Sequence, residues 1–391
     1  MPTAFDDGAA GIVPFNTPSF LGRELEYARA ALDQRHISGD GPFTKRAEQM
    51  LEHILDIPRV LLTTSCTHAL ELAALMLDLR PGDEVIMPPY TFVSTANAVV
   101  LRGAKPVFVD IREDTLNLDE RLVRDAVTSR TKAIFAVHYA GVACEMDALM
   151  ELAKMHDIAI VEDNAHGLFG TYKGRRLGTF GRFAALSFHE TKNITCGEGG
   201  ALLIRDRSDI ERAEIMREKG TNRSKFYRGE VDKYTWVDVG SSYILSDLLA
   251  GILTAQLECA DEIQDRRSRL WHRYRDGLAC WADLHDVRLP YVPPDCEHPF
   301  HMFYLIMPTE ADRDAFITYL RSHGIQAVFH YLPLHLSPMG RTLESVAAAC
   351  PVATDLAGRL VRLPFFTTLD EKRQQRVIEV VQSFTPRGVP A

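Results

Sequence analysis

Between residues 60 and 206 the sequence alternates short apolar runs with helix-like stretches, and this order constrains the fold most strongly. Several runs are almost continuously apolar, such as 133–137 and 158–161, as is typical of strands buried on both faces of a largely parallel sheet. We expect strands at 60–65, 84–88, 106–111, 132–139, 158–163, 184–189 and 200–205. The alternation predicts an α/β sandwich, with a seven-stranded, mostly parallel sheet between layers of helices.

The C-terminal part of the sequence has a different organisation. Helical patterns occur at 67–79 and 145–156, and a long one runs from 245 to about 278; prolines at 290, 293, 294 and 299 then mark a domain border. Beyond that border we expect strands at 301–307 and 326–330 and helices at 310–323 and 371–383. The prediction is an N-terminal arm and first helix (1–45), a large α/β domain that holds the cofactor (46–280) and a small C-terminal α+β domain (281–391).

Composition excludes several classes of protein. The 391 residues are 46% apolar and 25% charged, as expected for a soluble globular protein long enough for two domains. No apolar run approaches the ~20 residues of a membrane span, and residues 1–12 do not resemble a signal peptide. Seven widely spaced cysteines without a Cys-x-x-Cys pair indicate a reducing compartment and no zinc site. With a net charge of −9, we expect a cytoplasmic protein that binds neither nucleic acid nor a metal.

Two polar residues stand where apolar strands are expected to end. Asp163 closes the run 158–163, and Lys192 lies between another expected strand and the glycine-rich turn 197–200. Side chains at the carboxyl ends of parallel strands face the crevice where α/β proteins bind ligands. Pyridoxal phosphate (PLP) requires this pair, because the lysine forms a Schiff base with the aldehyde and the carboxylate keeps the pyridine nitrogen protonated. Alone, Lys192 would be a surface lysine and Asp163 a helix cap.

The segment Ser65-Cys66-Thr67 joins the first expected strand to a helix. Free N–H groups at a helix N-terminus bind phosphate, although the same segment also suits a simple N-cap. His166, shortly after Asp163, is a candidate to hydrogen-bond the phenolic oxygen of PLP, although a lone histidine is more often structural. A dehydrogenase would carry Gly-x-Gly-x-x-Gly after the first strand, and a zinc protease would carry a second histidine after His189. The sequence has neither pattern, and PLP remains the favoured cofactor.

With the phosphate loop, aspartate and lysine in this order, the chain resembles the fold-type I PLP enzymes, specifically the DegT/StrS group of sugar-nucleotide aminotransferases. The resemblance covers residues 14 to 384. It rests on the segments 14–15, 38–41, 81–86, 90–95, 137–141, 162–163, 188–193, 197–200, 220–224, 232–236, 240–243 and 330–335.

The resemblance implies a role for individual residues. Lys192 would carry the Schiff base and Asp163 would pair with the pyridinium. The other residues expected to contact the cofactor are Cys66, Thr67 and Ser187 at the phosphate, Phe92 stacked on the ring, and His166, where relatives have glutamine or histidine. In much of the group an asparagine from the second subunit reaches the phosphate, and the matching position here is Ser242, which has a shorter side chain. The group forms its active sites across a homodimer, which we expect here too.

A sugar nucleotide also needs partners for its pyrophosphate. Arg223, Lys225 and Arg228 are the candidates, with a solvated loop as the plainer interpretation. His330 and Tyr331 are candidates to border the sugar, or they simply end a strand.

The resemblance implies a transaminase that moves the amino group of L-glutamate to C4 of a dTDP-4-keto-6-deoxyhexose. The products would be dTDP-4-amino-4,6-dideoxygalactose and 2-oxoglutarate, in polysaccharide biosynthesis. The residues leave open gluco stereochemistry, amination at C3, and a PLP enzyme that does not transaminate. A dehydratase of this fold would replace Lys192 by histidine, and the neighbours of Cys296 do not resemble the loop of a cysteine desulfurase.

Overall fold

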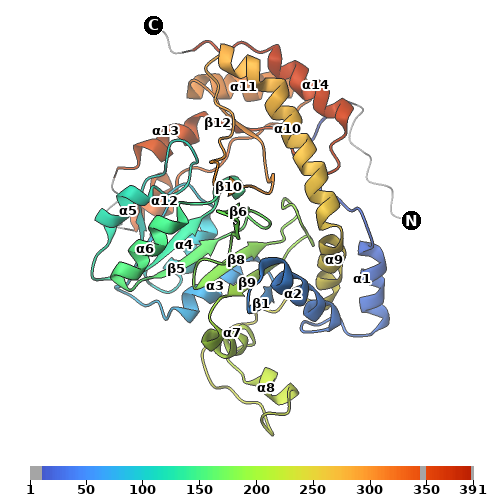
Figure 1. The fold of residues 1–391 in the computed structure, drawn as a ribbon, viewed down its shortest axis with the longest axis vertical. Coiled ribbons are helices and arrows are strands. Elements are labelled where there is room, and N and C mark those ends of the chain that lie inside the picture. Colours follow the sequence, from blue (N-terminus) through green and yellow to red (C-terminus); the bar gives the residue numbers. More distant parts are fainter. Residues whose placement is uncertain (1–10, 344–348, 389–391) are drawn as a thin grey trace.

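The computed structural model describes residues 11–343 and 349–388 and contains the expected seven-stranded sheet (Figure 1). Its strands are β1 (Arg59–Thr63), β2 (Glu84–Met87), β3 (Lys105–Phe108), β4 (Thr131–Val137), β5 (Ala159–Asp163), β8 (Phe183–Ser187) and β9 (Gly200–Ile204). They lie in the order β1-β9-β8-β5-β4-β2-β3. The pairs from β3 to β8 are parallel, and β9 is antiparallel to both β8 and β1. The prediction of a mostly parallel sheet is confirmed.

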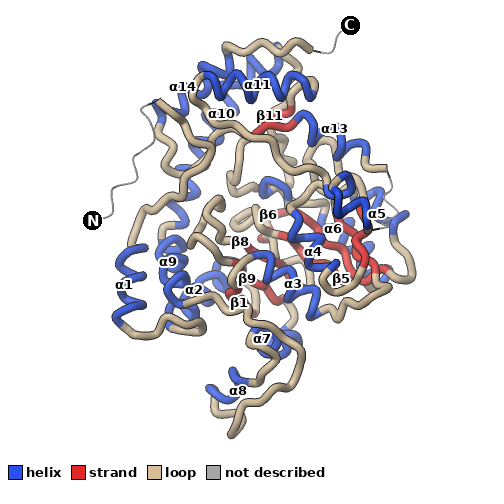
Figure 2. Tube along the Cα trace, turned by 180° about the vertical axis from the view of Figure 1, so that it is seen from behind, coloured by secondary structure: helices blue, strands red, loops and turns tan. Residues whose placement is uncertain are grey.

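Helices cover both faces of the sheet, which explains why its strands are almost continuously apolar. In β4, Phe135 packs in one core with α3 (Cys66–Met76), α4 (Val93–Val100) and α7 (Ile210–Arg217). Its neighbour Ile134 packs in another with α5 (Glu120–Ala126) and α6 (Met146–His156). A third core holds β1 and β9 against α1 (Glu24–Asp33), α2 (Pro42–Leu55) and α9 (Asp247–Glu258). Figure 2 shows the strands inside this layer of helices.

The long helical stretch expected from 245 to about 278 is helical and consists of two helices. The Ser246 hydroxyl accepts a hydrogen bond from Leu249 N (3.4 Å) and caps α9, which ends at Glu258. Cys259 then leaves helical geometry (φ −99°, ψ 11°), and α10 (Ala260–Leu284) begins. The second half of α10 packs in a separate core with β11 (Tyr304–Ile306), α11 (Glu310–Ser322) and α14 (Glu371–Gln382). The domain division at 45/46 and 280/281 stays a prediction.

One strand of the small α+β unit was predicted in the wrong place. Residues 326–330 form no strand, because their backbone pairs with two different segments. Gln326 N donates a hydrogen bond to Val13 O, and Val328 N donates one to Arg362 O, and each contact belongs to an isolated β-bridge rather than a continuous ladder. The strand that pairs with β11 is β12 (Leu360–Arg362), directly after α13 (Pro351–Arg359). The expected helices at 310–323 and 371–383 are confirmed as α11 and α14.

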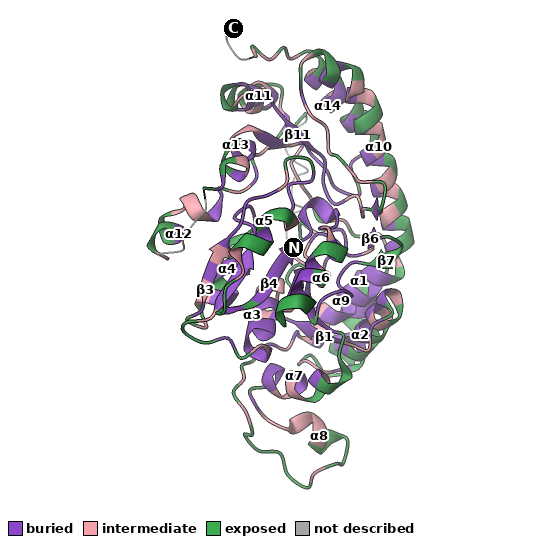
Figure 3. Cartoon of the chain, turned by 60° about the vertical axis from the view of Figure 1, so that its left-hand side comes forward, coloured by how far each residue is buried: buried purple, intermediate pink, exposed green. Residues whose placement is uncertain are grey.

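The remaining elements are short. They are β6 (Thr171–Tyr172), β7 (Arg175–Arg176), β10 (Cys296–Glu297), α8 (Arg223–Tyr227), α12 (Pro338–Thr342) and the single-turn 3-10 helices η1 (Tyr139–Gly141), η2 (Arg207–Asp209) and η3 (Leu334–Leu336). The projecting segment, residues 221–239, contains α8, extends from the body of the molecule and is largely exposed (Figure 3). Among the described residues, no helix combines the length and apolar character needed to cross a membrane. No group of three or more His, Cys, Asp or Glu side chains in the same part of the chain is placed to hold a metal ion.

Candidate functional site

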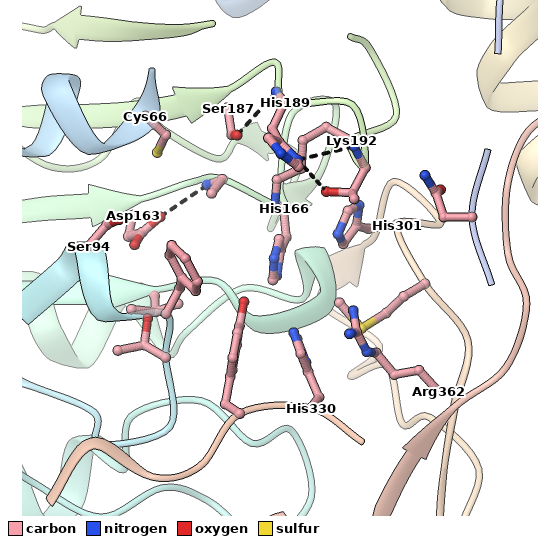
Figure 4. A pocket seen from close by; sticks show the side chains of 18 of the residues that line it. Cys66, Ser94, Asp163, His166, Ser187, His189, Lys192, His301, His330 and Arg362 are labelled. Atoms are coloured by element: carbon pink, nitrogen blue, oxygen red, sulfur yellow. Dashed lines mark hydrogen bonds between the residues drawn. The ribbon is translucent and has the colours of Figure 1, made fainter. Parts of the chain in front are cut away.

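A cavity of about 790 Å³ opens where β4, β5 and β8 end. On one side, the cavity is lined by the loops that follow these strands of the seven-stranded sheet and by the first turns of α3 and α4. Residues 301–302, 328–331 and 362–365, from the C-terminal part of the chain, close the other side. Most of the site residues that the sequence predicts line this cavity, namely Cys66, Thr67, Phe92, Asp163, His166, Ser187, Lys192, His330 and Tyr331. Figure 4 labels six of them, Cys66, Asp163, His166, Ser187, Lys192 and His330. Ser242, Arg223 and Arg228 are not among its lining residues.

Asp163 is the last residue of β5 and is only 6% exposed. Its Oδ2 accepts a hydrogen bond from the Thr95 hydroxyl (2.7 Å), and its Oδ1 accepts a longer one from Ala165 N (3.3 Å). Burial raises the pKa of Asp163, and the bond from Thr95 opposes that rise. A buried carboxylate facing a cavity is stabilised by a cationic ligand.

Lys192 lies in a loop that folds back against its own strand. Phe188 N donates to Gly199 O (2.8 Å), and Cys196 N donates to Phe188 O (3.0 Å), so residues 188–199 form a closed loop above β8. Gly197 turns this loop with φ +89°, a conformation that favours glycine. Removal from water lowers the pKa of Lys192 to about 8, against the attraction of the Asp163 carboxylate. The Lys192 amine therefore loses its proton more readily than an exposed lysine, and a larger fraction of it is neutral and nucleophilic near neutral pH than for an exposed lysine.

The N-terminus of α3 forms another wall of the cavity. Ser65 caps the helix by accepting a hydrogen bond from His68 N (3.1 Å). The Thr67 hydroxyl lies 2.7 Å from the Ser94 hydroxyl, at the start of α4. A Cβ on Gly200 would lie 2.3 Å from the Ser65 carbonyl carbon, so the missing side chain lets β9 approach this loop. Burial raises the pKa of the Cys66 thiol, which stays protonated beside the loop.

The first turn of α4 supplies groups to which the sequence analysis assigned no role. Phe92, just before the helix, keeps 56% of its surface exposed and lines the cavity. The two hydroxyl residues that follow contact different parts of the site. The Ser94 hydroxyl contacts the Thr67 hydroxyl, and the Thr95 hydroxyl contacts the Asp163 carboxylate. The segment 90–95 had been identified only as part of the resemblance. The hydroxyls at two consecutive helix positions, Ser94 and Thr95, were the signal that could have found them.

Three histidines from distant segments meet on the other side of the cavity. The rings of His166 and His301 stack at 4.3 Å with an interplanar angle of 20°. His330 Nδ1 lies 2.6 Å from the Tyr139 hydroxyl, and His301 Nδ1 lies 3.0 Å from Asn193 Oδ1, next to Lys192. Burial lowers the pKa of all three histidines, so the imidazoles are neutral. Neutral imidazoles offer hydrogen bonds to a ligand without adding positive charge beside Lys192.

Arg362, in β12, is a cation of the site that the sequence analysis missed. Its guanidinium lies 4.7 Å from the Phe15 ring centroid and lines the cavity, and its neighbours of opposite polarity among the described residues are the Tyr139, Tyr331 and Tyr90 hydroxyls rather than a carboxylate. Its Nε is buried without a hydrogen-bond partner among the described residues. Burial lowers its pKa. The sequence Leu360-Val361-Arg362-Leu363 carries no local sign of this role, which arises from pairing with β11.

The predicted pyrophosphate partners lie elsewhere in the chain, on the projecting segment around α8. Arg223 forms an ion pair with Glu218 (3.0 Å) and Arg228 with Glu214 (2.9 Å) and Glu230 (2.7 Å). Ser242 bridges to Glu218 at the base of the segment and is exposed. Within one chain these residues therefore do not contact the cavity.

Comparisons with known proteins agree with one another. The DegT/DnrJ/EryC1/StrS aminotransferase family model matches residues 20–382. The chain is 30% identical to GDP-perosamine synthase of Escherichia coli O157:H7, over 95% of this chain and 98% of that protein. It is 31% identical to the spore coat polysaccharide biosynthesis protein SpsC of Bacillus subtilis, over 95% of this chain and 96% of that protein.

A solved structure has the same fold over nearly the whole length. Spr1654 of Streptococcus pneumoniae, in its PMP form, superposes with a TM-score of 0.88 at 28% identity and covers 95% of this chain and 98% of its own. The same protein has also been solved in a PLP form, with a TM-score of 0.87.

Proposed function

The chain belongs to the DegT/DnrJ/EryC1/StrS aminotransferase family and is a PLP-dependent aminotransferase, and we propose that it aminates a nucleotide-activated keto sugar. In its specific form, the proposal is transfer of the amino group of L-glutamate to C4 of a dTDP-4-keto-6-deoxyhexose, with galacto stereochemistry. The observation that carries the aminotransferase chemistry is that the desolvated Lys192 amine and the buried Asp163 carboxylate line one cavity, whereas the sugar is proposed from the resemblance.

The residues around the cavity fit PLP. Asp163 is a buried carboxylate that gains from a pyridinium partner, and the N-terminus of α3 with Thr67 offers N–H and hydroxyl donors to a phosphate. Phe92 presents an exposed aromatic face at the cavity. Lys192 would hold the cofactor through its amine. When bound, PLP supplies the aldehyde and a ring that accepts electrons during proton transfer.

The protein's own groups then move the protons. Burial lowers the pKa of Lys192 to about 8, which suits proton transfer, and in this proposal its Nζ removes the proton from Cα of the amino donor. In the second half of the reaction it delivers a proton to C4 of the sugar. In this proposal His166 and His330 border the cofactor and the substrate. Because burial lowers the pKa of both imidazoles, they hold no proton to donate as imidazolium, and Lys192 carries the proton instead.

Arg362 is suited to the amino donor. A buried guanidinium without an acidic partner gains from binding a carboxylate, and Arg binds carboxylates through two parallel hydrogen bonds. We expect Arg362→Leu to raise KM for L-glutamate at least about 100-fold, while KM for the sugar changes little, because a hydrogen-bonded charge pair contributes several kcal/mol. Arg362→Lys should recover only part of this loss. Equal KM values for glutamate in wild type and Arg362→Leu would contradict the assignment.

The sugar nucleotide needs a site that a single chain does not complete. The projecting segment around α8 carries Arg223, Lys225 and Arg228, and it exposes aromatic groups such as Trp236 (78% exposed). In the proposed homodimer the partner subunit covers this segment, and Ser242 with the arginines reaches the other active site. Sedimentation of a monomer that retains full activity would overturn this arrangement. The cytoplasmic location also stays a prediction.

The substrate assignment is tested by product analysis. The purified protein would be incubated with L-glutamate and either dTDP-4-keto-6-deoxyglucose or GDP-4-keto-6-deoxymannose, a comparison suggested by the GDP-sugar named for one relative. We expect 2-oxoglutarate and an amino sugar from the dTDP substrate, and proton couplings of the purified product should show an axial amine at C4. Product from the GDP substrate alone would refute the dTDP assignment and keep the aminotransferase.

A further inference from the structure

Two buried threonine hydroxyls stand behind the Asp163 carboxylate. The Thr95 Oγ1 donates to Asp163 Oδ2 (2.7 Å), and the Thr91 Oγ1 lies 2.9 Å from Thr95 Oγ1. The Thr95 side chain is fully buried, and Thr91 is almost fully buried. Water therefore does not compete for these bonds, and each is stronger than an exposed one.

The direction of the bonds follows from the number of protons. A hydroxyl has one proton to donate, and an ionised carboxylate can only accept. Because Thr95 gives its proton to Asp163, it must accept at its oxygen, so Thr91 is the donor in the Thr91–Thr95 bond. The bonds therefore run in one direction, from Thr91 through Thr95 to Asp163.

We propose that Thr95 is a positioning residue that fixes the Asp163 carboxylate for the ring nitrogen of PLP, with Thr91 holding Thr95 in place. Oδ2 is occupied by Thr95, whereas Oδ1 accepts only the longer bond from Ala165 N (3.3 Å) among the described residues and keeps a lone pair for the cofactor. This inference rests on the proposed role of Asp163 as the pyridinium partner.

The helix that carries Thr95 makes the arrangement rigid. Thr95 lies in the first turn of α4, next to Ser94, whose hydroxyl lies 2.7 Å from the Thr67 hydroxyl at the N-terminus of α3. One helical turn therefore fixes the position of Asp163 relative to the phosphate end. The hydroxyl also favours the ionised form of Asp163, because a hydrogen bond donated to a carboxylate lowers its pKa.

The test replaces the hydroxyl without changing the shape of the side chain. We expect Thr95→Val apoprotein to bind PLP about tenfold more weakly, the effect of losing one hydrogen bond to a charged group. The pKa read from the visible absorption of the bound cofactor should also rise. A carboxylate held less firmly stabilises less positive charge on the ring, and a less positive ring lets the linking lysine nitrogen keep its proton to higher pH. Thr95→Ser keeps the hydroxyl, and both values should return toward wild type.

The outcomes separate positioning from packing. Unchanged PLP affinity and titration in a folded Thr95→Val protein would overturn the inference, as would equal defects in Thr95→Val and Thr95→Ser. If Thr95→Val does not fold, Thr91→Val takes its place, and we expect the same two changes at smaller size; wild-type values in that variant would overturn the inference instead. PLP binding by the wild type is measured in parallel, since failure there refutes the proposed function itself.

Discussion

Lys192→Ala should lose transamination by more than about 10³-fold, because a positioned general base alone contributes about 10²–10⁴-fold and the same group also holds the cofactor. The loss should appear in both half-reactions, measured separately as 2-oxoglutarate formed from glutamate and as amino sugar formed from the keto sugar. The desolvated amine has no substitute, since no other lysine lines the cavity in the part of the chain that the structure describes.

A matched control distinguishes the loss of this amine from the loss of any lysine. Lys173 is half-exposed, pairs with Asp147 (2.7 Å) and lies outside the cavity, so Lys173→Ala should retain wild-type activity. Unfolding of the Lys192 variant is checked by circular dichroism. Near-wild-type activity of folded Lys192→Ala would remove the central residue of the mechanism.

Asp163→Asn should reduce the rate of the first half-reaction and the affinity for PLP by about 10²–10³-fold each, the size expected when one partner of a buried charge pair is removed. The thermal stability of the apoprotein, in contrast, should not fall. Burial raises the pKa of Asp163, so at pH 7 the ionised side chain destabilises the folded apoprotein, and a neutral amide removes this cost. We therefore expect the Tm of Asp163→Asn apoprotein to equal or exceed that of wild-type apoprotein.

The two measurements on Asp163→Asn are made on the same preparation. PLP affinity is measured by titration of the apoprotein, and Tm by calorimetry without cofactor. The exposed Asp147→Asn serves as the control for loss of a carboxylate, and it should change neither value. Wild-type PLP affinity and rate in Asp163→Asn would show that the carboxylate does not pair with the cofactor.

The sheet was predictable from the sequence because each of its strands is a short apolar run flanked by helix or turn signals. Strand ends shifted by one or two residues, as for β4, which was expected at 132–139 and spans Thr131–Val137. The strands of the small C-terminal α+β unit were harder to predict. The apolar segment 326–330 reads as a strand, yet its backbone bonds are divided between Val13 and Arg362, which no local pattern reveals.

The site shows the same limit. Asp163, Lys192 and the loop before α3 were found because each follows an apolar run, where a ligand-facing side chain is expected. Arg362 and His301 were missed, because the chain brings them to the cavity only through the packing of the small unit on the large one. Thr95 was missed because its role depends on a contact with Asp163, 68 residues away in sequence.

The most direct test of the central claim is to locate the covalently bound cofactor. The purified protein would be saturated with PLP, reduced with borohydride, digested and analysed by mass spectrometry. We expect a phosphopyridoxyl group on Lys192 alone, and none when the PLP-saturated protein is incubated with L-glutamate before the borohydride is added. Modification of another lysine, or none at all after saturation with PLP, would contradict the assignment of Lys192.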